Sequence, residues 1–320
     1  MLPEIAVDGN GAERAQTLTV ETLPGVSQDI VIDNVASSVD FLTVTVANSQ
    51  KSILLMQEAQ RLKGDLEGCG WAVKKWGMHG YAGYRIAGMA WGMRHDGCIM
   101  MLSGQDAAIN WLPALALAEN VTRLDLAATV SLGSPFINVA KAAYARAITD
   151  PEKCFAKRRK YSFVENSGGG QTCYIGSRIS DQFGRIYDKG CESAKDAICL
   201  PGMLWRYEVE FKSYRAKKLA RQMEASAKAE TETVADGIRH LVYNWFRARG
   251  IPPIFNEPPS DVDWTLELEA RITDDEASLN WLTVQVRPSV ERLLERGREV
   301  EILEALGIHV VHSKMDAVET

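Results

Sequence analysis

The sequence predicts an α+β fold, with a mainly antiparallel central sheet, helices packed on one side of it and a small helical region at the C-terminus. Three observations lead to this class. The predicted elements begin in the order strand–helix–strand–strand–helix–strand, which is typical of α+β domains. Several strands alternate polar with apolar residues, as antiparallel sheets with one solvated face do. A segment with four prolines, residues 250–261, separates a last helical stretch from the rest.

Eight segments have the β-branched content or the period-2 alternation of strands. Asp96-Gly97 is a strong hairpin signal and joins the second of these segments to the third. The predicted strands are 39–46, 80–94, 97–103, 121–130, 161–165, 173–178, 183–189 and 204–212.

Helices are predicted where apolar residues recur with helical spacing or where Ala, Lys, Glu and Arg predominate. The predicted helices are 51–63, 107–119, 135–148, 214–249 and most of 279–306. Residues 1–35 have weak periodicity and several glycines, so we expect an N-terminal arm there. The expected organisation is an arm (1–35), a main domain (36–249), a Pro-rich linker (250–261) and a helical C-terminal region (262–320).

The composition excludes several classes of protein. The chain has 320 residues, of which 46% are hydrophobic, an ordinary value for a globular protein that can build its own core. No stretch approaches the roughly 18 apolar residues of a membrane span, and the N-terminus lacks a secretory pattern. The six cysteines form no C-x-x-C pair, which favours free thiols in a reducing compartment. We therefore expect a cytoplasmic protein without a membrane partner.

Charge is distributed unevenly along the chain. The net charge is −6, but residues 153–221 contain 15 Lys and Arg against 7 Asp and Glu, which leaves −14 for the remainder. A basic segment within an acidic protein indicates a polyanionic partner. An ordinary solvated face is the alternative.

Three predicted strands place charged residues on one face, because side chains alternate across a strand. The opposite face of 204–212 is apolar and therefore predicted to lie in the core. The polar faces could be the wet side of an ordinary antiparallel sheet. If the three strands are neighbours, however, acids and cations gather at one place. The residues concerned are Arg123 and Asp125; Arg185, Tyr187 and Lys189; and Arg206, Glu208, Glu210 and Lys212.

Such a cluster predicts a metal-assisted reaction at a phosphate. Asp125, Glu208 and Glu210 would repel one another unless a cation lay between them, and carboxylate oxygens suit Mg²⁺ or Mn²⁺. Tyr187 is the candidate nucleophile, since a neighbouring Arg185 and Lys189 would lower the pKa of its phenol. Tyr174 and Tyr207 are competitors, although Tyr207 falls on the apolar face.

Missing motifs narrow the chemistry further. The five histidines form no His-x-His pair, so the two-histidine metal strand of one large class of DNA-nicking enzymes is absent. The chain also has no G-x-x-x-x-G-K-[ST] loop, which argues against an ATP-driven helicase.

The same segments resemble the Rep_trans family of replication initiators of rolling-circle plasmids and some phages, to which relaxases of conjugative elements are related. The similarity runs over about residues 38–220. It is carried by TRLDLA (122–127), YIGSRISDQFGRIYDK (174–189) and LWRYEVEFK (204–212), with VDFLTVTV (39–46) and the Leu102–Gly104 loop as further matches.

The resemblance implies that Tyr187 is the nucleophile and that Asp125, Glu208 and Glu210 lie at a metal-dependent centre holding Mg²⁺ or Mn²⁺. Many relatives carry a second Asp four residues after the first, where this chain has Thr129. Residues 36–249 are then a catalytic domain that nicks one strand of origin DNA. The products are a 5′-phosphotyrosine and a 3′-hydroxyl primer for rolling-circle replication.

Origin DNA, single-stranded or extruded as a hairpin, is the expected partner, and relatives often work as dimers with a host helicase and polymerase. The cations expected to contact DNA are Lys157, Arg158, Arg159, Lys160, Arg178, Arg206 and Lys212. Two alternatives stay open: a relaxase with the same chemistry, and a non-catalytic DNA-binding protein on the same fold.

Overall fold

The computed structural model describes residues 16–23, 26–47, 49–136, 138–149, 160–167, 169–193, 200–229, 231–256, 264, 279 and 281–305. Two units divide the chain, Met1–Thr265 and Leu266–Thr320. The functional residues that the sequence predicts all belong to the first unit. None of the described helices is long and apolar enough to cross a membrane.

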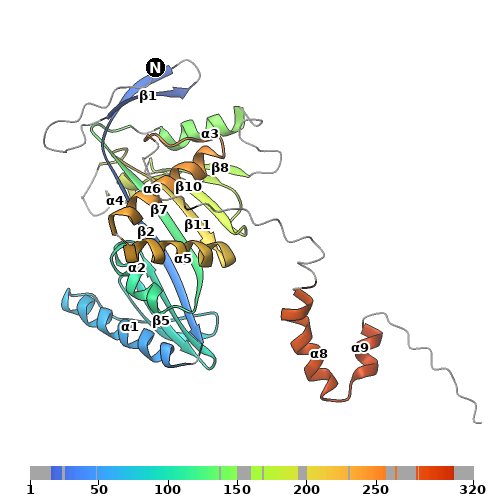
Figure 1. The fold of residues 1–320 in the computed structure, drawn as a ribbon. Helices are drawn as coiled ribbons and strands as arrows, with labels where there is room; N and C mark the ends of the chain where they lie inside the picture. The colour runs from blue at the N-terminus through green and yellow to red at the C-terminus, as the bar shows by residue number, and fades with distance from the viewer. Residues whose placement is uncertain are drawn as a thin grey trace, which may run out of the picture. The chain divides into compact units, whose positions relative to one another are not determined.

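One antiparallel sheet forms the centre of the first unit (Figure 1). Among the described residues it has eleven strands, in the order β3-β4-β5-β6-β2-β7-β11-β10-β9-β8, and β1 pairs with β2 outside this path. The predicted α+β class with an antiparallel sheet is thus confirmed. The strands are β1 (Gln16–Leu23), β2 (Val26–Ala47), β3 (Lys74–Met78), β4 (Tyr81–Ile86), β5 (Met89–Arg94), β6 (Gly97–Ser103), β7 (Asn120–Leu132), β8 (Tyr161–Glu165), β9 (Gln171–Ile175), β10 (Gln182–Asp188) and β11 (Leu204–Lys212).

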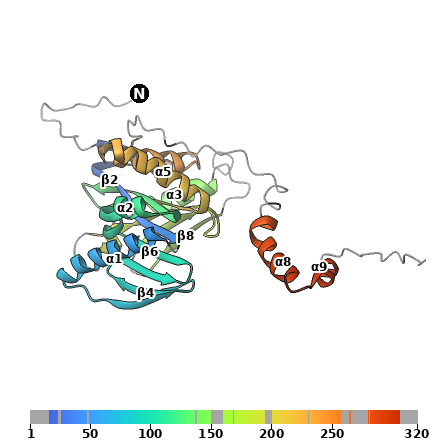
Figure 2. The ribbon, with the colours of Figure 1, turned by 60° about the horizontal axis from the view of Figure 1, so that its bottom comes forward.

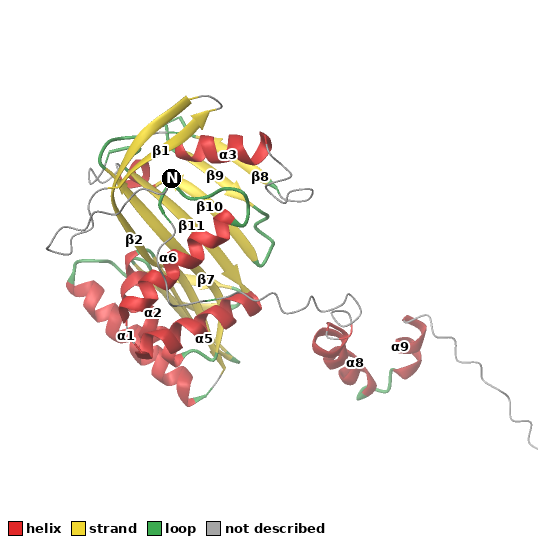
Figure 3. Ribbon diagram, turned by 45° about the horizontal axis from the view of Figure 1, so that its top comes forward, coloured by secondary structure: helices red, strands yellow, loops and turns green. Residues whose placement is uncertain are grey.

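Helices cover one face of this sheet. Figure 2 and Figure 3 show α1, α2 and α5 on the same side of the strands. Helix α5 buries Ala216, Leu219, Ala220 and Met223, a spacing that places all four on one side of a helix. The helices of this unit are α1 (Gln50–Gly68), α2 (Gln105–Leu117), α3 (Val139–Thr149), the short α4 (Lys189–Ser193), α5 (Ser213–Ala229) and α6 (Thr231–Arg247).

The apolar side of β11 lies under these helices. Trp205, Tyr207, Val209 and Phe211 are buried, which confirms the predicted core face. The rings of Tyr207 and Phe246 meet edge to face at 5.3 Å between centroids. Because strand side chains alternate, this packing forces the residues between them onto the face without helices.

Two predicted elements are each divided in the structure. Segment 80–94 is not one strand but the hairpin β4–β5, with its turn at Ala87-Gly88, where Ala87 adopts a φ of +46°. Segment 214–249 is α5 followed by α6, which pack against each other and against β7. Folding back allows both helices to bury an apolar side on the sheet, which one continuous helix could not do. Strand β3 was not predicted.

Both segments that flank the predicted main domain contribute to the first unit. Residues 16–35, within the expected arm, form β1 and the start of β2. In the expected linker, Ile251, Ile254 and Phe255 are buried, and the Ile254 N–H donates to the Tyr207 hydroxyl at 3.2 Å. The Pro-rich composition therefore marks the end of the helices rather than the end of the packed unit.

The second unit is helical where it is described. It contains a π-helical turn, η2 (Leu282–Val286), and the helices α8 (Arg287–Leu294) and α9 (Glu299–Ala305). This agrees with the predicted helical C-terminal region.

Candidate active site

Charged side chains of β7, β10 and β11 lie together on the face of the sheet opposite the helices. These three strands are neighbours in the order β7-β11-β10. The register pairs Asp125 with Glu210, Glu208 with Arg185, and Arg206 with Tyr187. Side chains paired in this way lie within reach of each other. The structure therefore brings together six of the predicted site residues.

Tyr187 and Arg185 hold the same carboxylate. The Tyr187 hydroxyl donates to Glu208 Oε2 at 3.2 Å, and Arg185 Nη2 lies 2.5 Å from Glu208 Oε1. Burial, followed by the negative charge of Glu208, raises the pKa of the Tyr187 phenol, so the prediction that neighbouring cations would lower it is wrong. Burial also raises the pKa of Glu208, against the opposing effect of Arg185. The phenol is thus protonated at neutral pH and sits beside a carboxylate with increased affinity for a proton.

Asp125 and Glu210 share a different arginine. Arg123 Nη2 lies 2.6 Å from Asp125 Oδ2 and 2.8 Å from Glu210 Oε2, while Lys212 Nζ lies 2.6 Å from Glu210 Oε1. The Asp125 side chain is 1% exposed. Burial raises the pKa of Asp125 to about 7, although the Arg123 guanidinium opposes this shift. At neutral pH Asp125 is therefore only partly ionised, and its ionised form is stabilised by Arg123 on the same strand.

The three predicted metal ligands consequently fall into two groups. Asp125 and Glu210 converge on Arg123, whereas Glu208 turns toward β10. Within the part of the chain that the structure describes, no three His, Cys, Asp or Glu side chains are arranged to hold a metal ion. The oxygens of Asp125 and Glu210 nevertheless approach one cationic nitrogen, and hard oxygen ligands are what Mg²⁺ and Mn²⁺ take. The donor set of these two residues fits a shared divalent cation.

Arg206 contacts residues of two other strands, Thr129 of β7 and Asp40 of β2. Its Nε donates to Thr129 Oγ1 at 2.9 Å, and its guanidinium forms an ion pair with Asp40. Asp40 is the extra residue of a bulge in β2, between Val39, opposite Leu126, and Phe41, opposite Asp125. Such a bulge redirects a side chain within a strand. Thr129 and Asp40 thus hold the Arg206 guanidinium on the face that carries Tyr187.

Sequence reasoning did not include Asp40 among the site residues, and it placed Arg123 on the charged face without giving it a role. Both occur in segments that it had singled out, Asp40 in VDFLTVTV and Arg123 in TRLDLA. An acid inside a β-branched run was the available signal for Asp40. The bulge that directs it toward Arg206 has no signal in the sequence, since a strict period of 2 does not anticipate an extra residue.

The cations predicted to contact DNA have different surroundings. Arg178 is exposed and lies over the rings of Tyr174 and Phe183, at 5.4 and 5.5 Å from their centroids. Its carbonyl oxygen accepts a hydrogen bond from Lys212. Lys160 is exposed. Lys189, predicted to assist the nucleophile, pairs with Glu192 at 2.6 Å. Lys157, Arg158 and Arg159 lie outside the described residues.

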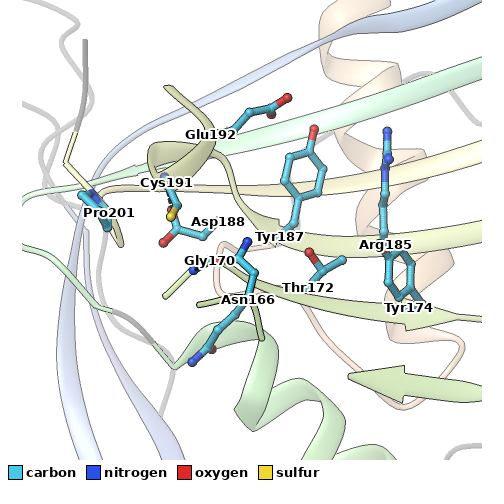
Figure 4. Close-up of a pocket in the computed structure, with 11 residues that line it drawn as sticks. Asn166, Gly170, Thr172, Tyr174, Arg185, Tyr187, Asp188, Cys191, Glu192 and Pro201 are labelled. Carbon is cyan, nitrogen blue, oxygen red and sulfur yellow. Dashed lines mark hydrogen bonds between the residues drawn. The ribbon is translucent and has the colours of Figure 1, made fainter. Parts of the chain in front are cut away.

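A pocket of about 570 Å³ adjoins the nucleophile candidate on its β9 side. Figure 4 shows the Tyr187 ring between Arg185 and the α4 residues Cys191 and Glu192. Asp125, Glu208 and Glu210 are not in its wall. The lining residues are Asn166, Gly170, Gln171, Thr172, Tyr174, Arg185, Tyr187, Asp188, Cys191, Glu192 and Pro201.

Comparison with protein families finds a match over residues 119–244 to Rep_trans, described as a replication initiation factor. This part of the chain, the Rep_trans segment, resembles that family. The resemblance inferred from the three motifs is therefore confirmed. The Rep_trans segment extends from β7 to α6 and contains Asp125, Tyr187 and Glu208, together with the pocket beside Tyr187.

Two further comparisons concern the whole chain. Among solved structures, the chain is similar to the rolling circle replication initiator protein of Geobacillus stearothermophilus, with 21% identity and a TM-score of 0.43. That similarity covers 68% of this chain and 86% of the other. The comparison with curated proteins finds no match.

Proposed function

We propose that this protein initiates replication by nicking one DNA strand at an origin, with Tyr187 as the nucleophile. In this reaction the Tyr187 oxygen forms a bond to phosphorus, and the bond between phosphorus and the 3′ oxygen breaks. The products are a 5′-phosphotyrosine and a free 3′-hydroxyl that a polymerase can extend. The observation that carries the proposal is the part-buried hydrogen bond from Tyr187 to Glu208, inside the Rep_trans segment.

Glu208 is suited to take the phenolic proton. It is the acceptor of the Tyr187 hydroxyl, its side chain is 2% exposed, and burial raises its pKa. A base within hydrogen-bond distance can remove the proton as the new bond forms. The leaving 3′ oxygen takes up a proton, so the step is balanced overall.

Three cations surround the position that a phosphate would occupy at the Tyr187 hydroxyl. The Arg185 guanidinium lies 5.1 Å and the Lys189 ammonium 5.9 Å from the centre of the Tyr187 ring. Arg206 is the register partner of Tyr187 on β11. Positive groups at these positions stabilise the negative charge that develops on the phosphoryl oxygens.

A divalent cation, Mg²⁺ or Mn²⁺, is part of the proposal. Asp125 and Glu210 would hold it, because they already converge on one cationic nitrogen, and Glu208 is the next carboxylate along β11. When bound, the ion would polarise the phosphoryl oxygen as a Lewis acid. Single-stranded or hairpin origin DNA is the proposed substrate, and a host helicase and polymerase would act after the nick.

The test uses a supercoiled plasmid that carries the DNA flanking the gene. With Mg²⁺ or Mn²⁺, the wild type should relax the plasmid and leave protein covalently attached to 5′ ends. Tyr187→Phe should form no adduct, while Tyr84→Phe, on the distant β4, should match the wild type. Adducts that persist in Tyr187→Phe but disappear in Tyr174→Phe would assign the nucleophile to Tyr174 and refute the proposal.

A further inference from the structure

Two cations face each other at the end of the sheet that is remote from Tyr187. Lys74 on β3 and Arg85 on β4 are register partners, and both are exposed. Among the described residues, neither side chain takes part in an ion pair or a hydrogen bond. The cations around Tyr187, in contrast, are each paired with an acid. Like charges directly opposite each other destabilise a sheet, so this pair favours an anionic ligand.

The register places this pair on the same face of the sheet as the candidate active site. Residues that are paired across antiparallel strands point to the same side, and one row of such residues crosses the sheet from Lys74 to Lys212. Its far end reaches the acids of the site, because Arg123 pairs with Asp125. The row consists of Lys74, Arg85, Ala90, Met101, Thr43, Arg123 and Lys212.

Trp76 adds an aromatic surface beside the two cations. It follows Lys74 by two positions on β3, so both side chains lie on the same face. Its register partner Gly83 and the next residue of that row, Gly92, have no side chains, and a Cβ added at Gly92 would lie 3.3 Å from Cζ3 of the indole. The half-buried ring therefore lies over this glycine. Aromatic rings next to cations are what proteins use to hold single-stranded nucleic acids.

We propose that Lys74, Arg85 and Trp76 bind the single-stranded DNA that flanks the scissile phosphate. The two cations contact its backbone, and one base stacks on the indole. The inference rests on the proposed nicking reaction, which identifies the polyanion as DNA. These residues lie outside the segment that matches Rep_trans, residues 119–244, so the family match assigns them no role.

The surface between the two ends suits a strand that crosses the sheet. From β4 to β10 there are six strand spacings of about 4.8 Å each, so the bound strand spans about 29 Å. Between the basic ends of the row, the residues Ala90, Met101 and Thr43 carry no charge that would repel a phosphate. A duplex keeps its bases stacked on one another, so only a single strand can place a base on Trp76.

The test measures binding of a fluorescein-labelled single strand, taken from the DNA that flanks the gene and long enough to cross about 29 Å. Fluorescence anisotropy without divalent cations reports binding without chemistry. In the double variant Lys74→Gln with Arg85→Gln, the slope of log K against log salt should become shallower by about 1.4, because each single-strand phosphate contact contributes about 0.7. Trp76→Leu should weaken binding by about fivefold, the lower end of base–aromatic stacking, and should leave the slope unchanged.

Lys75→Gln is the matched control, because Lys75 is the next residue of β3 and is also exposed. It lies on the helix-covered face, in the row that contains the buried Met100 and Val44, and this variant should keep the wild-type slope.

Two results would overturn the inference. One is a slope that the double variant leaves unchanged, or that Lys75→Gln reduces as much for each charge removed. The other is a Trp76→Leu variant that binds single strands as tightly as the wild type. A wild-type protein that shows the expected binding but forms no adduct in the plasmid assay would refute the nicking reaction and support the DNA-binding surface.

Discussion

Replacing Asp125 by Asn should change how the stability of the protein depends on pH. The pKa of the Asp125 carboxyl is raised from 3.8 to about 7, first by burial. Between pH 3.8 and about pH 7, the Asp125 carboxyl binds a proton in the folded protein but not in the unfolded chain. The free energy of unfolding therefore falls as pH rises through this window, and above pH 7 the folded protein bears the full cost of an ionised buried carboxylate.

The size of the effect follows from the two pKa values. For a single group that titrates at 3.8 unfolded and at about 7 folded, the free energy of unfolding should fall by about 2.5 kcal/mol between pH 5 and pH 8. Asn cannot titrate, so Asp125→Asn should lack this component. The assay is urea unfolding from pH 5 to pH 8 without divalent cations, and the relevant quantity is the difference between the two curves.

Asp106→Asn provides a control, since Asp106 accepts the Gly88 N–H at the start of α2, away from the charged face. Its pH dependence should run parallel to that of the wild type. Parallel curves for the wild type and Asp125→Asn would refute the reasoning, because they would show that Asp125 ionises in the folded protein as easily as in the unfolded chain.

Two further predictions concern the packing that positions the site. In a double-mutant cycle, Asp40→Ala and Arg206→Ala should couple by about 2 kcal/mol in urea unfolding, because the two side chains form an ion pair and are only 15% and 14% exposed; additive effects would show that the bulge does not anchor Arg206. Gly184→Ala should destabilise the protein by about 1–3 kcal/mol, since an added Cβ would lie 2.3 Å from Trp245. The loss should be smaller when Trp245 is replaced by Leu, and an equal loss in that background would contradict the clash.

Much of the sheet was predictable, because strands with one apolar and one charged face carry their own signal. The alternation in 204–212 placed Tyr207 in the core and Glu208 on the opposite face, as the structure has them. Alternation also states which residues of one strand share a face, so Arg185 could be grouped with Tyr187, and Glu208 with Glu210, from the sequence alone. Whether residues of different strands meet depends on the order of the strands, which alternation does not give. The resemblance to Rep_trans motifs predicted that the three strands β7, β10 and β11 contribute to one site.

The sequence could not predict the backbone conformation of individual turn residues or which acid pairs with which base. The Ala87-Gly88 turn lacks the Asn-Gly or Asp-Gly pair that usually indicates a two-residue hairpin. The charges on the three strands also allowed several pairings. That Arg123 joins Asp125 to Glu210, while Arg185 joins Glu208 to Tyr187, follows from the register and from side-chain rotamers, which composition does not encode.

The ion pairs on this face have a consequence for the proposed reaction. Among the described residues, the three cations near Tyr187 are each already paired with an acid: Arg185 with Glu208, Lys189 with Glu192 and Arg206 with Asp40. A phosphate that arrives at the half-buried site therefore competes with these acids for its cations, and an uncompensated buried charge is costly. Transfer of the Tyr187 proton to Glu208 neutralises that carboxylate and moves its negative charge to the phenol oxygen, which passes it on to the phosphoryl group as the new bond forms. It converts the phenol into a nucleophile and, in the same step, releases Arg185 from its carboxylate to hold the phosphate. The hydrogen bond between Tyr187 and Glu208 would then couple activation of the nucleophile to binding of the phosphate that it attacks.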